Sequence, residues 1–126
     1  MAHGANHPAP TISTHVLDTE RGVPAVGVHV TLYRIADDGR PLRLTQALTD
    51  SDGRVRDLLD RPLTAGDYRL EFALSHELED APPGSPPPAE PFFRRLSVDL
   101  RVTDTGRSYH VPLLLAPFSM TTYRGS

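Results

Sequence analysis

The stretch VHVTLY, residues Val28–Tyr33, has the two-residue period of a β-strand. Every second residue, starting at Val28, is aliphatic, and histidine, threonine and tyrosine stand between them. In a strand this spacing directs the aliphatic side chains to one face of a sheet. The segment therefore predicts a strand with one buried face, and it gives no support to a helix.

Further segments on both sides of this stretch also read as strands. They are residues 12–17, 42–49, 68–72, 96–102, 111–115 and 120–123. Turn-forming stretches such as Thr49–Gly53, TDSDG, separate them. Seven or eight short strands at roughly ten-residue spacing, without a βαβ rhythm, predict an all-β fold, an antiparallel β-sandwich.

Three segments do not fit the strand pattern. Ser75–Asp80, SHELED, is expected to form one short helix that Ser75 could cap. Ala81–Pro91 is dense in proline and is expected to be an exposed, extended loop. We expect residues 1–11 to be a disordered tail and residues 12–126 to form a single domain.

Composition excludes several classes of function. The chain of 126 residues has no cysteine, so it has no disulfides, thiolate metal sites or cysteine nucleophiles. Its thirteen basic residues are all arginines, which excludes a Schiff-base lysine, and its net charge of -3 disfavours nucleic acid as a partner. No metal-binding spacing such as HExxH is present, and we expect no metal and no cofactor. With no apolar run long enough for a membrane span and no secretion signal at its start, the protein is expected to be cytoplasmic.

Histidines are the first candidates for chemistry, and there are six: His3, His7, His15, His29, His76 and His110. His15 lies within a predicted strand and His110 directly precedes one, and their parity puts both on the face opposite to the aliphatic residues. A histidine in a strand is usually a partnered structural residue, so pattern alone leaves both a structural and a catalytic role open.

Three separate blocks of the sequence resemble the transthyretin-like family, and specifically its 5-hydroxyisourate hydrolases. They are Thr14–Pro24 (THVLDTERGVP), Tyr109–Pro117 (YHVPLLLAP) and the terminal Tyr123–Ser126 (YRGS). The last block distinguishes the hydrolases from the hormone-carrying transthyretins. The resemblance implies a transthyretin-like sandwich that assembles into a homotetramer, a dimer of dimers, with active sites in the groove where the dimers meet.

The resemblance also implies an activity and a set of site residues. The activity is hydrolysis of 5-hydroxyisourate, the product of urate oxidation, to 2-oxo-4-hydroxy-4-carboxy-5-ureidoimidazoline, one step upstream of allantoin. The catalytic residues that it implies are His15, Arg54, His110 and Ser126. For substrate binding it implies His15, Arg54 and Tyr123.

These residue types suit the opening of a cyclic imide by water. Imidazoles exchange protons near neutral pH, so His15 and His110 could share the attacking water. The guanidinium of Arg54 could anchor an oxygen-rich ring and polarise its carbonyl. Tyr123 offers a hydroxyl or a flat face, and Ser126 offers a hydroxyl and the terminal carboxylate, either of which could orient a histidine. Because no serine stands in a nucleophile elbow, direct attack by water is favoured over an acyl-enzyme.

Two other classes of protein remain as alternatives. One is a non-catalytic small-molecule carrier resembling transthyretin, which holds a ligand between dimers. The polar residues His15, Arg54 and His110 argue against it, because a hydrophobic ligand would leave them desolvated. The other is a purely structural sandwich module, which has no need of a polar C-terminal tetrapeptide.

Overall fold

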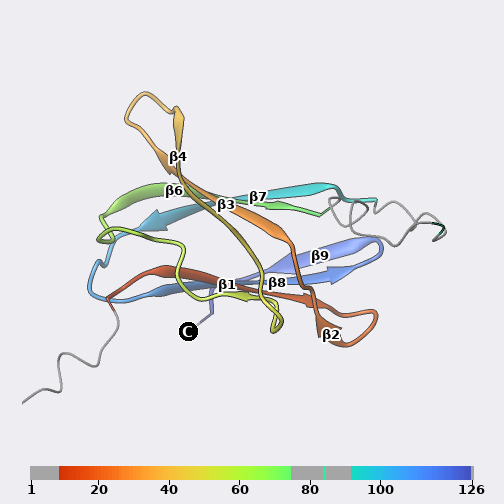
Figure 1. The fold of residues 1–126 in the computed structure, drawn as a ribbon. Coiled ribbons are helices and arrows are strands. Elements are labelled where there is room, and N and C mark those ends of the chain that lie inside the picture. The colour runs from red at the N-terminus through yellow and green to blue at the C-terminus, as the bar shows by residue number, and fades with distance from the viewer. Residues whose placement is uncertain (1–8, 75–83, 85–91, 126) are drawn as a thin grey trace, which may run out of the picture.

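Two stacked β-sheets make up the structure, a computed structural model that describes residues 9–74, 84 and 92–125 (Figure 1). The first sheet contains β1 (Ile12–Asp18), β2 (Val23–Pro24), β5 (Arg54–Val55), β8 (Tyr109–Ala116) and β9 (Ser119–Thr122). The second sheet contains β3 (His29–Ile35), β4 (Pro41–Leu48), β6 (Gly66–Ala73) and β7 (Arg95–Val102).

The predicted β-sandwich is confirmed, and each predicted strand lies within one or two residues of an observed one. The two-residue strands β2 and β5 were not predicted, because a period of two cannot be recognised over so short a run. The predicted helix at Ser75–Asp80 lies outside the described residues, as do residues 1–8 and all of the Ala81–Pro91 loop except Gly84. Among the residues described, no helix is long and apolar enough to span a bilayer.

One strand pair departs from the antiparallel expectation. β1 runs parallel to β8, with Ile12 opposite Tyr109 and Asp18 opposite Leu115, so the first sheet is mixed. In the sequence, all four strands of the second sheet lie between β1 and β8. β1 and β8 are therefore not joined by a hairpin, which would have forced them to be antiparallel.

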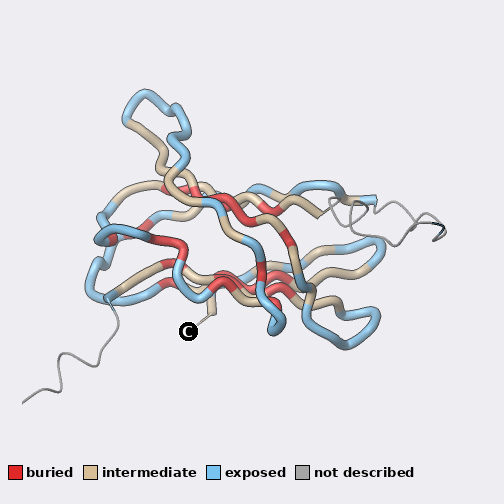
Figure 2. The backbone as a smooth tube through the Cα atoms, in the orientation of Figure 1, coloured by how far each residue is buried: buried red, intermediate tan, exposed pale blue. Residues whose placement is uncertain are grey.

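The core lies between the two sheets (Figure 2). Its largest fully buried side chains include Tyr68 and Phe72 from β6 and Ile12 from β1. Along β1, residues 12, 14 and 16 are buried, whereas 13 and 15 are partly exposed. This alternation directs Ser13 and His15 to the outer face of the first sheet, and it positions the candidate site there.

Candidate active site

Four polar side chains gather on the outer face of the first sheet, where three strands lie side by side. In the β1–β8 register Ser13 stands opposite His110, and in the β1–β5 register His15 stands opposite Arg54. Residues directly opposite each other in neighbouring strands present their side chains on the same face. Strand pairing thus brings together His15, Arg54 and His110, which are far apart in the sequence.

His110 makes a direct contact with Ser13. The Ser13 Oγ lies 2.8 Å from the His110 Nδ1, in a partly buried hydrogen bond. Sequence reasoning missed Ser13, although it lies two residues before His15 and therefore shares its face. The alternation along the strand is enough to place Ser13 on the same face as His15. Only the register between β1 and β8 shows that its partner is His110.

The surroundings of His110 favour its neutral form. Burial of the ring lowers the pKa of His110 below its ordinary value, and the positive charge of Arg54 and the nearby His15 lower it further. An uncharged imidazole at neutral pH can accept a proton. His110 is therefore suited to act as a general base.

A cavity of about 280 Å³ opens beside these residues. It is lined by Ser13, Thr14, Arg54, Arg56 and His110. Two guanidinium groups and an imidazole give it donors for a small ring that carries several oxygens. Arg56 was not predicted, and its guanidinium lies 3.5 Å from the Asp52 carboxylate. His15 does not line this cavity. It lies next to the cavity because it is paired with Arg54, which does line it.

A tight turn holds Arg54 at the start of β5. The backbone N–H groups of Arg54 and Asp52 each donate to Oδ1 of Asp50, both at 2.9 Å. The Arg54 N–H in particular holds the pKa of the Asp50 carboxyl below its usual value. Gly53 has a positive φ of 75°, and a Cβ there would lie 2.4 Å from the Val16 carbonyl oxygen. Only glycine fits this point of the turn.

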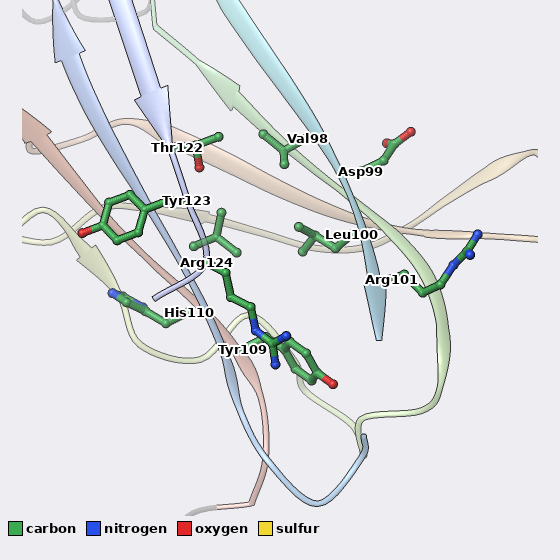
Figure 3. A pocket seen from close by; sticks show the side chains of 10 residues that line it. Val98, Asp99, Leu100, Arg101, Tyr109, His110, Thr122, Tyr123 and Arg124 are labelled. Carbon is green, nitrogen blue, oxygen red and sulfur yellow. The ribbon is translucent and has the colours of Figure 1, made fainter. Parts of the chain in front are cut away.

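The segment that follows β9 lies next to His110. The Gly125 N–H donates to the His110 carbonyl oxygen at 2.8 Å. Tyr123 and His110 point to the same side of the chain, whereas Arg124 points to the other (Figure 3). There the Arg124 guanidinium lies 4.9 Å from the centroid of the Tyr109 ring, in a cation–π contact.

A second cavity, of about 300 Å³, lies between this end of the first sheet and β7 of the second, and its lining includes both His110 and Tyr123. Of the five predicted site residues, the structure thus brings His15, Arg54 and His110 together and places Tyr123 beside His110. Ser126 lies outside the described residues. Within residues 9–74, 84 and 92–125, no group of three or more acidic, histidine or cysteine side chains could hold a metal ion.

Comparisons with known proteins relate the chain to one family. The model of the HIUase/Transthyretin family matches residues 12–125. A 5-hydroxyisourate hydrolase of Deinococcus radiodurans is 42% identical over 119 residues, which cover 93% of this chain and 97% of that protein.

Solved structures of two kinds share the fold. The Klebsiella pneumoniae 5-hydroxyisourate hydrolase superposes with a TM-score of 0.76 at 33% identity, over 93% of this chain and 99% of the other. Transthyretin from Sparus aurata superposes with a TM-score of 0.78 at 28% identity, over 94% and 97% of the two chains. The fold alone therefore does not separate an enzyme from a carrier, and the side chains of the site must do so.

Proposed function

The chain belongs to the HIUase/transthyretin family, and from this premise we propose that it is a 5-hydroxyisourate hydrolase. It opens the ring of 5-hydroxyisourate to give 2-oxo-4-hydroxy-4-carboxy-5-ureidoimidazoline, within the degradation of urate to allantoin. The observation that carries this conclusion is the match to curated hydrolases along nearly the whole chain. The polar cluster of His15, Arg54 and His110 supports it.

His110 is the proposed general base. Its neutral ring takes a proton from the water that attacks a ring carbonyl of the substrate, and its lowered pKa supports this role. Arg54 donates hydrogen bonds to the carbonyl oxygen as negative charge develops on it. When the C–N bond breaks, the departing nitrogen takes the proton back from the imidazolium, which leaves a carboxyl group on the product. His15, opposite Arg54, shares the attacking water with His110.

Two residues of the C-terminal tetrapeptide complete the proposed site. Tyr123 binds the substrate through its hydroxyl or the face of its ring, and its position beside His110 supports this role (Figure 3). Ser126 follows Gly125, whose N–H is bonded to the His110 carbonyl. The hydroxyl of Ser126 is proposed to orient a histidine.

Residues 12–126 are proposed to be the hydrolase domain of a cytoplasmic homotetramer, a dimer of dimers, with sites in the groove between dimers. Exposed aromatic side chains at the two ends of β9 support association, since Phe118 is 82% exposed and Tyr123 is 54% exposed. Sedimentation at micromolar concentration is expected to give the mass of a tetramer. A strict monomer would contradict a site formed between subunits.

A non-catalytic carrier is not favoured. The cavity beside His110 is lined by Arg54 and Arg56, and an apolar ligand would offer no hydrogen-bond acceptors to their guanidinium groups. An anionic, oxygen-rich substrate would satisfy them instead.

The activity can be tested on freshly generated 5-hydroxyisourate, which absorbs in the near ultraviolet and decays spontaneously. The purified protein is expected to accelerate the decay in proportion to its concentration. A decay rate equal to that of buffer alone would refute the proposed function.

A further inference from the structure

Ser13 is a polar residue of the site that the mechanism above leaves without a role. We propose that Ser13 is a positioning residue, whose Oγ accepts the Nδ1–H of His110 and so keeps the lone pair on Nε2 for the attacking water. This inference rests on the proposed function and assigns a residue that the sequence did not suggest. It stands on the 2.8 Å contact between Ser13 Oγ and His110 Nδ1.

Both partners are fixed by the fold. Ser13 lies between Ile12 and Thr14, which are buried in the core, and the Thr14 hydroxyl donates to the Val111 carbonyl at 2.6 Å. The backbone of His110 is held on its other side by the N–H of Gly125. The hydrogen bond therefore joins two rigid strands, and little conformational entropy is lost in forming it.

The direction of the hydrogen bond follows from the proton count of the ring. A neutral imidazole carries one proton, so a ring that acts as base through Nε2 must hold its proton on Nδ1. A serine oxygen can accept that proton's hydrogen bond. After His110 takes a second proton from water, Nδ1–H is still a donor, and Ser13 can remain its acceptor throughout the cycle. A serine that donated to Nδ1 would require the ring proton on Nε2, and Nε2 could then not take a proton from the water.

The absence of charge on serine matters as much as its position. A carboxylate at position 13 would stabilise the imidazolium and raise the pKa of His110. The charged and titratable groups nearest the ring, Arg54 and His15, act in the opposite direction, and Arg56 lines the same cavity. Ser13 therefore orients the ring of His110 without adding a negative charge, which would oppose the lowering of the pKa of His110.

The tautomer can be measured without substrate, from the ¹⁵N chemical shifts of the His110 ring in the wild-type protein. The expected state is Nδ1–H, with a shift toward the Nε2–H tautomer in Ser13→Ala. Because this measurement is independent of turnover, a folded protein with no activity would refute the proposed function, while the NMR spectrum would still decide the hydrogen bond. A wild-type ring in the Nε2–H tautomer would overturn the inference.

Kinetics supply the second test. Ser13→Ala is expected to lower kcat about three- to tenfold with little change in KM, the scale of one lost hydrogen bond, and Ser13→Thr is expected to restore it. Ser13→Asp is expected to move the acid limb of the kcat/KM profile to higher pH. Thr19→Val is the matched control, since it removes a hydroxyl that donates to the Leu115 carbonyl at 2.7 Å, at the end of the β1–β8 pair away from Ser13, and lines neither cavity.

Wild-type kcat in Ser13→Ala, or an acid limb that Ser13→Asp leaves in place, would contradict the inference. If Ser13→Ala does not fold, the wild-type tautomer and the Ser13→Asp profile decide the question.

Discussion

Gly125 lies directly against the ring of His110. A Cβ added to Gly125 would stand 2.8 Å from Cδ2 of that ring, closer than real Cβ contacts allow, so the imidazole would have to move. Since φ of Gly125 is not in the left-handed region, the contact alone makes a side chain unfavourable there.

Gly125→Ala is therefore expected to lower kcat/KM for 5-hydroxyisourate by about tenfold or more, because a small misplacement of a reacting group is costly. The midpoint of urea unfolding should change little. Gly106→Ala is the control, since its added Cβ would meet only the Asp104 carboxylate, at 3.2 Å. Equal rates in the two variants would show that the position of His110 does not depend on Gly125.

The pH dependence of activity follows from the lowered pKa of His110. As the pH falls through that pKa, the ring gains a proton and can no longer act as base, so kcat/KM should fall. The fall should occur below the pH at which an ordinary histidine titrates. Because the unfolded chain binds this proton more readily, the free energy of unfolding should decrease over the same range.

An NMR titration of His110 checks the cause of this shift. Replacing Arg54 by glutamine removes a positive charge next to the ring, and the pKa of His110 should then rise. A wild-type pKa at or above the ordinary value would contradict the assignment of His110 as a neutral base.

Asp50 is expected to matter for activity through Arg54. Asp50→Ala removes the acceptor of the Arg54 N–H and loosens the turn before β5, so kcat/KM should fall several-fold. Asp38→Ala is the matched control: Asp38 accepts the N–H of Arg40 at 3.0 Å in a similar turn between β3 and β4. Only the first substitution should affect turnover in the decay assay. A similar loss in both variants would indicate a general effect on the fold.

The period-two pattern was sufficient to predict the sandwich, because most strands have one buried face. The same parity placed His15 and His110 on faces opposite to the core. The pattern could not reveal that β1 pairs with β8 in parallel, or that Ser13 meets His110, because both depend on pairing between distant segments. Arg54, His110 and Tyr123 entered the candidate site through family resemblance, since their own positions resemble those of ordinary surface or strand residues.

The core and the site should respond separately to mutation. Leu70 is fully buried on β6 in the second sheet, so Leu70→Ala is expected to lower the free energy of unfolding by about 2–5 kcal/mol. Activity per folded molecule at low temperature should remain close to that of the wild type, because the site is on the outer face of the other sheet. Urea unfolding and the decay assay measure the two quantities, and a large loss of activity in the folded variant would show that core and site are coupled.

The most direct test of the account is the rate of 5-hydroxyisourate decay with His110→Asn, compared with the wild type at equal concentration. Asparagine keeps a polar side chain in the cavity but cannot take a proton from water. The expected result is a fall in kcat/KM of roughly 10²–10⁴-fold, the usual contribution of general acid–base catalysis, with the fold preserved. A folded His110→Asn protein that accelerates the decay as well as the wild type does would contradict it.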